Sequence, residues 1–213
     1  HPPIPPNVIY VNVGAFLLSG FFLSAKVWKK EICLVYAGQQ LFFAYNMYTN
    51  PSMGYTKWQR LRMSVHQAGC AAMFILLSSL HDPKQSKHLR KIAETLTGFF
   101  LIAYTYMLNN SPEDRRALLA HIPGDDWSRY VVTLILAAGA VCFFSGHFLR
   151  DISISLVVVF AILTLFVDCD IDYWVKSKHM HIWNQIRIII DNICIIIGLS
   201  VVIMKFGNKV KME

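Results

Sequence analysis

The sequence predicts an all-α polytopic membrane helix bundle with seven transmembrane helices in this chain, and three observations lead to that fold class. Of the 213 residues, 55% are hydrophobic and only 15% are charged, whereas a soluble domain carries about 25% charged residues. Seven apolar runs approach the ~20 residues that a spanning helix needs. The connections between them are too short for a soluble domain. Helices satisfy the backbone in lipid, and the runs are too long for barrel strands.

Each predicted helix is an apolar run with few charges, bounded by polar or basic residues. In chain order the runs are Val8–Ala25, Ile32–Tyr48, Met63–Leu80, Ile92–Leu108, Tyr130–Phe148, Ile152–Val167 and Ile186–Phe206. Although the net charge is +7, the basic residues gather between these runs, where they report topology rather than nucleic-acid binding. We therefore expect the lipid bilayer as a partner and no nucleic acid. Loops 26–30 and 84–91 and the C-terminus are predicted to be cytosolic.

Two short signals agree with this orientation. Lys209 and Lys211 near the C-terminus resemble a dilysine retrieval signal of the endoplasmic reticulum, which is read in the cytosol. The alternative is a basic tail that extends to the headgroups after the last helix. Asn109, followed by Asn110 and Ser111, forms a candidate glycosylation sequon on the predicted lumenal side.

The sequence also predicts an internal duplication. Each copy enters through Ile-Pro, continues into a helix that ends in Ser-Gly, and reaches its last helix through a Trp-x-x-x-Arg edge. These features fall at Ile4-Pro5, Ser19-Gly20 and Trp58 to Arg62, and again at Ile122-Pro123, Ser145-Gly146 and Trp183 to Arg187. We expect two parallel four-helix repeats at residues 1–80 and 92–206, followed by a cytosolic tail at 207–213. Because the run at 92–108 has no counterpart in the first copy, the first helix of repeat one is expected upstream of His1.

The two edges carry the candidate site residues. Arg62 and His66 are four residues apart, and Arg187 and Asp191 repeat that spacing. Residues four apart share a helix face, so Arg187 is expected to reach Asp191. Ionisable groups inside a membrane mark candidate functional sites. Two interpretations stay open: a polar lock in which arginine extends to the headgroups, or a ligand pocket lined by these four groups.

Other polar and aromatic residues indicate ordinary membrane edges. Trp58 and Trp183 are expected in the interfacial aromatic belt. The alternating Asp168, Asp170 and Asp172 lack the glycine turn and ligand spacing of a calcium loop and are interpreted as a solvated lumenal loop. Histidines 179 and 181 do not supply the three or four ligands of a zinc site. With no nucleophile–base set, phosphate loop or HExxH pattern, we expect no enzyme, no metal and no cofactor.

Several stretches carry a family likeness. Ser111–Gly124 (SPEDRRALLAHIPG), Phe143–Leu149 (FFSGHFL) and Tyr173–Ile188 (YWVKSKHMHIWNQIRI) resemble the transmembrane protein 101 family, and Thr56–Ser64 (TKWQRLRMS) extends the likeness over nearly the whole chain. The resemblance implies an eight-helix membrane protein with an indirect link to NF-κB signalling, and it supplies no catalytic residues. The four-helix unit is also distantly DoxX-like at His179–Trp183. Bundles of that kind include sterol-binding proteins, a sterol isomerase and a receptor-assembly chaperone, although fold analogy says little about function.

The first functional interpretation is a non-enzymatic multi-pass protein of the endoplasmic reticulum or another endomembrane. It would act as an accessory, assembly or signalling partner of another membrane protein. The alternative is a small-lipid or sterol-binding protein, isomerase-like, with a pocket between its helices. A cavity of several hundred Å³ beside His66 or Asp191 would favour binding. A transporter is the third interpretation, because parallel repeats permit transport but no helix shows paired Gly/Pro breaks.

Overall fold

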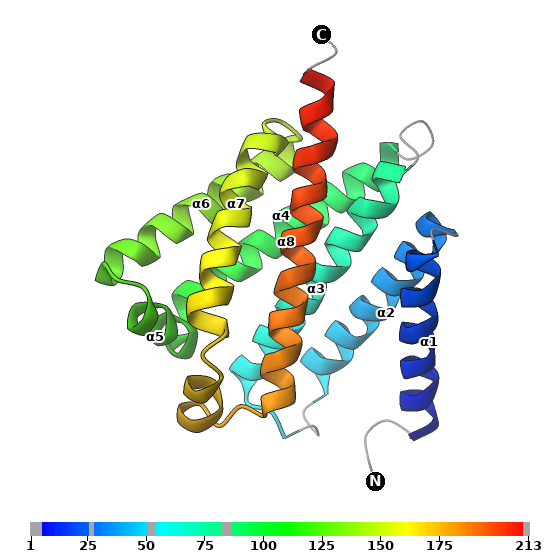
Figure 1. The fold of residues 1–213 in the computed structure, drawn as a ribbon. Helices are drawn as coiled ribbons and strands as arrows, with labels where there is room; N and C mark the ends of the chain where they lie inside the picture. The colour runs from blue at the N-terminus through cyan, green and yellow to red at the C-terminus, as the bar shows by residue number, and fades with distance from the viewer. Residues whose placement is uncertain (1–5, 26–27, 51–53, 82–86, 211–213) are drawn as a thin grey trace.

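The chain folds into a bundle of helices. The computed structural model describes residues 6–25, 28–50, 54–81 and 87–210, and all regular elements within these ranges are helical (Figure 1). The elements in chain order are α1 (Pro6–Ser24), α2 (Lys29–Thr49), α3 (Lys57–His81), α4 (Lys87–Asn110), α5 (Pro112–His121), α6 (Asp125–Ser145), α7 (Leu149–Ile162), η2 (Leu163–Asp168), η3 (Tyr173–Ser177) and α8 (Ile182–Val210). The predicted all-α class is confirmed.

Four helical stretches among the described residues are long and apolar enough to cross a membrane. They are Lys57–Leu80, Asp125–Ser145, Leu149–Asp168 and Ile182–Lys205. Seven spans were predicted, and three helices fall short for identifiable reasons. Helix α2 carries Gln39 and Gln40 and α4 carries Glu94 inside otherwise apolar sequence, while the described apolar part of α1 is only Gly14–Ser24. That α1, α2 and α4 also cross the membrane stays a prediction.

Helix α3 is the central element of the bundle. It packs against α2, α4 and α8 (Figure 1), and 78% of its apolar window is buried. Glycines permit two of these contacts: a Cβ on Gly69 would lie 2.5 Å from the ring of Phe100 in α4, and a Cβ on Gly198 would lie 2.7 Å from Cβ of Met73. Because α3 comes from the first predicted repeat and α4 and α8 from the second, the core joins both. The duplication and its boundaries stay predictions.

Two local features between the long helices position polar groups in the core. Helix α5, which the hydropathy pattern did not predict, begins where Ser111 accepts a hydrogen bond from the backbone N–H of Asp114 at 3.3 Å. Pro112 at the first helical position supports this start, because its missing N–H would have no partner there. Helix α7 continues into the π-helical segment η2, and π-helical turns frequently occur at functional sites. These two elements carry Asp114 and Asp168.

Candidate functional site

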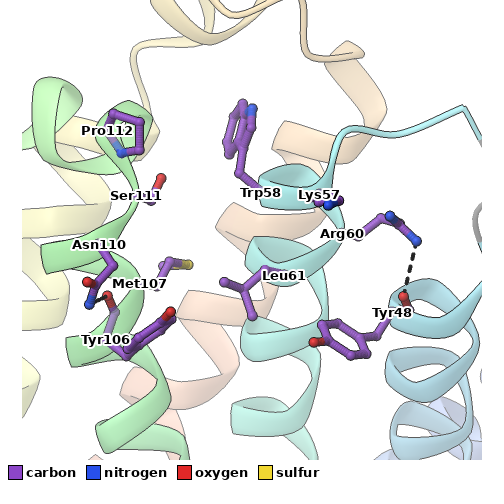
Figure 2. Close-up of a pocket in the computed structure, with 10 residues that line it drawn as sticks. All are labelled: Tyr48, Lys57, Trp58, Arg60, Leu61, Tyr106, Met107, Asn110, Ser111 and Pro112. Atoms are coloured by element: carbon purple, nitrogen blue, oxygen red, sulfur yellow. Dashed lines mark hydrogen bonds between the residues drawn. The ribbon is translucent and has the colours of Figure 1, made fainter.

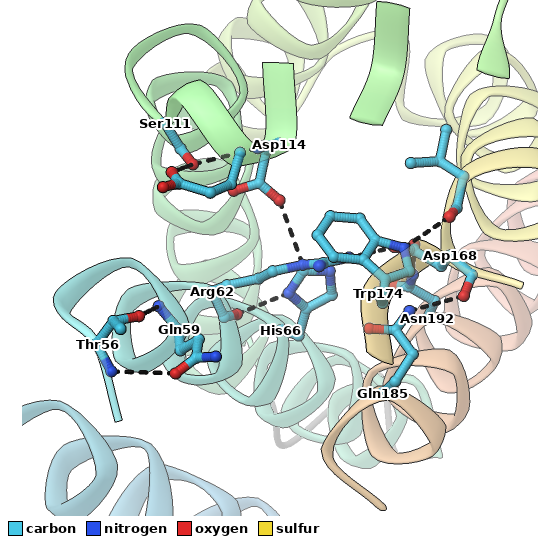
Figure 3. A network of polar contacts seen from close by, with 12 residues as sticks. Thr56, Gln59, Arg62, His66, Ser111, Asp114, Asp168, Trp174, Gln185 and Asn192 are labelled. Atoms are coloured by element: carbon cyan, nitrogen blue, oxygen red, sulfur yellow. Dashed lines mark hydrogen bonds and ion pairs between the residues drawn. The ribbon is translucent and has the colours of Figure 1, made fainter. Parts of the chain in front are cut away.

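The most concentrated group of polar side chains surrounds Arg62 in the first turns of α3 (Figure 3). Its side chain is 2% exposed. One guanidinium nitrogen donates to Asp168, and Nε lies 3.3 Å from Oδ1 of Asp114. The guanidinium also lies over the ring of Trp174, 3.5 Å from its centroid. One arginine therefore joins α3, α5, η2 and η3, with two carboxylates facing one guanidinium.

Asp168 is the residue on which this network converges. Asn192 donates to Oδ2 of Asp168 at 2.7 Å, and Gln185 donates to its backbone carbonyl at 2.7 Å. The donors lie seven residues apart on α8 and share one face of that helix. Next to it, Trp174 donates its indole N–H to the carbonyl of Val167 at 2.8 Å. This is a correction: the alternating aspartates do not form a solvated loop as a group, because Asp168 is 2% exposed and bound by three side chains from two helices, α3 and α8.

Asp114 closes the network from α5. It is 6% exposed, and burial raises the pKa of its carboxyl above the ordinary range, while Arg62 and the hydrogen bond with Ser111 act in the opposite direction. The space beside Arg62, Asp114 and Asp168 measures about 10 Å³, which holds at most one water molecule. The charges of the cluster thus pair with one another, although Nε and Nη1 of Arg62 and Oδ2 of Asp114 make no hydrogen bond there, and the space has no room for a ligand.

His66 lies one turn beyond Arg62 on α3. It is 1% exposed, its Nδ1 lies 2.7 Å from the carbonyl oxygen of Arg62, and its ring packs edge-on against Tyr104, with centroids 5.4 Å apart. The Nε2 atom is buried without a hydrogen-bond partner. His66 and Asp191 make no hydrogen bond with each other within the described ranges, and the groove that Asp191 lines does not include His66 among its lining residues.

Asp191 and Arg187 line a groove of about 640 Å³ between α1, α2, α3 and α8. Asp191 is 5% exposed, and its Oδ2 atom has no hydrogen-bond partner. The expected direct ion pair with Arg187 does not form within 4.0 Å among the described residues, although the charge of Arg187 lies near enough to act on Asp191. An arginine near a membrane edge can extend toward the headgroups instead. The groove is otherwise lined mainly by apolar and aromatic side chains: Phe16, Leu23, Tyr36, Phe43, Phe74, Trp183, Ile186 and Ile190.

The remaining predicted residues lie in different settings. Trp183 is 69% exposed, whereas Trp58 is half-buried with its ring centroid 6.1 Å from that of Trp174. Asn109 Nδ2, where a glycan would be attached, donates to Thr105 and to Thr133 at 2.8 and 2.9 Å. Lys211 and the side chain of Lys209 lie outside the described residues. In the part of the chain that the structure describes, no three His, Cys, Asp or Glu side chains form a group that could hold a metal ion.

The sequence pattern identified Arg62 but missed the partners it binds. Asp114 and Asp168 lie 52 and 106 residues further along the chain, so no local spacing joins them to Arg62. One signal was present: Gln185 and Asn192 place two amides on one face of an apolar helix, and such groups require partners inside a membrane. Asp170 and Asp172 do lie near the surface. Asp170 pairs with His121 at 2.9 Å, and Asp172 pairs with Lys176 at 3.1 Å.

Comparison with known proteins agrees with the family resemblance seen in the sequence. No solved structure matches the chain. The family model of the TMEM101 protein family matches residues 1–205, which covers the Arg62 network, both tryptophan–arginine edges and the four apolar spans. A family with these apolar helices is a family of multi-pass membrane proteins. With nearly the whole sequence matched, the chain belongs to the TMEM101 protein family.

Proposed function

We propose that this protein is a non-enzymatic accessory of another membrane protein, acting in its assembly or signalling, and that the groove beside Asp191 receives a transmembrane helix of that partner. The observation that carries the proposal is the buried Asp191, which lines an open groove of about 640 Å³ and whose Oδ2 atom has no hydrogen-bond partner among the described residues. An ionised side chain inside a bilayer costs about 2.5–3.5 kcal/mol on insertion scales. A lysine, arginine or hydroxyl group on a partner helix would offset that cost.

The shape of the groove supports a helix as the occupant. Gly20 of α1 lines it, and a Cβ at Gly20 would meet nothing within 4 Å. Small residues let helix backbones approach closely in membranes, where packing and interhelical hydrogen bonds drive association. The absence of catalysis is part of the same proposal. It is supported by the Arg62 network, whose charges bind one another around a space of only about 10 Å³.

A sterol or another small neutral lipid is the second candidate for the same groove. Its volume falls within the ~300–1,000 Å³ of ordinary ligand pockets. Aromatic rings of Tyr36, Phe74 and Trp183 line it beside the carboxylate, an arrangement that suits a flat apolar molecule with one hydroxyl group. The accessory role stands first because the groove is open along a helix rather than enclosed.

The proposal includes a location and a topology. Lys209 and Lys211 favour the endoplasmic reticulum or another endomembrane, and the loop charges favour a cytosolic C-terminus. The proposed topology also has α1, α2 and α4 crossing the bilayer and a four-helix unit that occurs twice. A glycosylation tag appended after Glu213 tests this topology: we expect it to stay unmodified, and a glycosylated tag would contradict the orientation.

A photo-cross-linking residue at Ile190, which lines the groove, tests the occupant in cells. We expect a cross-link to a transmembrane helix of one membrane protein, and its loss in Asp191→Asn but not in the control Asp151→Asn, which alters an exposed carboxylate on α7. The same two variants in an NF-κB reporter assay test the signalling link. Adducts with lipid alone would favour the sterol interpretation. Adducts that do not depend on Asp191 would contradict both.

A further inference from the structure

A second groove, on the opposite side of α3 from Asp191, has a basic entrance and an apolar interior. The entrance is a cavity of about 600 Å³ between the start of α3 and the end of α4 (Figure 2). Lys57, Trp58 and Arg60 lie on one side of it, and Asn110 and Ser111 lie on the other. Since α3 is a membrane span that begins at Lys57, this entrance lies at the membrane edge, where aromatic and basic side chains meet headgroups.

The basic groups at the entrance have no acidic partners. Neither Lys57 nor Arg60 forms an ion pair within the described part of the chain. Arg60 donates one hydrogen bond, from Nη1 to the carbonyl of Tyr48 at 3.3 Å, and its Nε is buried with no partner. A buried charged donor without an acceptor is costly. An anionic oxygen in the cavity would satisfy it once the Arg60 side chain turns from the Tyr48 carbonyl toward the headgroup.

A second, apolar groove adjoins the entrance. It measures about 310 Å³, and Tyr48 and Leu61 form part of the wall of both spaces. Its α3 wall is Leu61, Ser64, Val65 and Ala68, which follow one another on a single helix face. At 1.5 Å per residue, Ala68 lies about 16 Å along α3 from Lys57. The two adjoining spaces together therefore change from basic to apolar along α3, as an amphiphile does along its length.

We propose that this site binds an anionic single-chain lipid, with a carboxylate or phosphate headgroup at Lys57 and Arg60 and an acyl chain between α2, α3 and α4. The site lies away from Asp191 and does not depend on the occupant of that groove. Both headgroup chemistries present acceptor oxygens to the same two cations. A zwitterionic headgroup of equal chain length would bring a positive charge to the same entrance and bind less well.

Native mass spectrometry of the full chain in a neutral maltoside detergent tests the site with four probes: oleoyl lysophosphatidate, oleate, oleoyl lysophosphatidylcholine and inorganic phosphate. We expect one bound lysophosphatidate or oleate, about tenfold weaker binding of lysophosphatidylcholine, and no binding of phosphate at the same concentration. Preference between the first two probes distinguishes a phosphate from a carboxylate headgroup. Equal binding of all three lipids, or binding of phosphate as tight as that of lysophosphatidate, would overturn the proposal.

Three variants locate the site. Arg60→Gln should weaken binding roughly tenfold or more, Lys57→Gln about two- to fivefold because it is exposed, and Ala103→Phe should abolish binding by filling the apolar groove. Arg150→Gln, an exposed arginine on α7, is the matched control and should bind normally. If Arg60→Gln does not fold, lipid binding by the Lys57→Gln and Ala103→Phe variants still decides whether the site exists. Unchanged binding in both of these variants would refute the site.

Discussion

The two tryptophan–arginine edges of this protein start from the same pattern and end in opposite environments. In the first, Arg62 is buried between Asp114 and Asp168, and its Trp58 packs beside Trp174. In the second, Trp183 is exposed and Asp191 faces an open groove. The difference is that α5 and η2 bring carboxylates to the first edge, whereas Asp191 forms no ion pair within 4.0 Å among the described residues. A polar residue inside a membrane becomes a lock or a site depending on what the rest of the fold supplies.

The largest expected effect comes from removing the arginine of the closed edge. Arg62→Met should lower the free energy of unfolding by about 3–5 kcal/mol, because it leaves two buried carboxylates without a counter-ion. Steric-trap unfolding in detergent measures this change. Arg187→Met at the open edge should change stability by less than about 1 kcal/mol. Similar losses in the two variants would mean that the edges do not differ as described.

Neutralising one carboxylate at each edge should have effects of opposite sign. Asp168→Asn should lower the free energy of unfolding by about 2–3 kcal/mol, since it loses the charge that accepts from Arg62 and Asn192. Asp191→Asn should raise it by about 1 kcal/mol, because an unpaired carboxylate in a span is replaced by a neutral amide. Thermal unfolding of both variants checks the signs. A destabilised Asp191→Asn would indicate a hidden partner for that carboxylate.

Two glycines extend the comparison to packing: Gly198 lies in the tight contact between α3 and α8, and Gly20 lines the open groove. Gly198→Ala should cost about 1–3 kcal/mol, because the new Cβ would lie 2.7 Å from Cβ of Met73 and the backbones must separate. Gly20→Ala in the groove meets nothing within 4 Å and should be neutral or stabilising, as alanine favours helix by up to about 1 kcal/mol. Tm shifts of both variants report the difference. A tolerant Gly198 would show that the α3–α8 contact is loose.

The smallest expected effect is a pH dependence near the closed edge. Burial lowers the pKa of His121, but its hydrogen bonds to Ala117 and Asp170 outweigh this and raise it, while His121 lowers the pKa of Asp170. The contribution of the pair to stability is therefore fully present below about pH 6.5, down to about pH 3.9. It is lost as the pH rises through the raised pKa of His121.

The pair is near the surface, so we expect less than about 1 kcal/mol from it. The difference in Tm between wild type and His121→Gln, followed from pH 5 to pH 8.5, should shrink as the pH rises. The control Lys176→Gln removes the exposed pair with Asp172 and should show no such trend over this range. A difference that grows with pH would contradict the assignment.

The apolar parts of the long helices could be located from the sequence, but not their polar beginnings. The predicted run Met63–Leu80 corresponds to α3, which begins at Lys57, because hydropathy detects only the apolar part of a helix. Helix α5 was missed because it is polar and short, although Ser111 followed by Pro112 gave a recognisable helix start. The Trp-x-x-x-Arg edges were visible in the sequence. Which edge would find partners was not, since Asp114 and Asp168 reach Arg62 only through tertiary packing.

The sequence separation within the Arg62 network has a consequence for synthesis. Arg62 is translated 106 residues before Asp168, an interval of roughly 5–20 s at ordinary elongation rates. For the first part of that interval, before Asp114 is made, α3 carries near its end an arginine with neither of its carboxylate partners, at a cost of about 2.5–3.5 kcal/mol. We therefore expect α3 to remain loosely inserted until α7, η2 and α8 have followed. Chains arrested before Asp168 should be the form of this protein that quality control in the membrane removes.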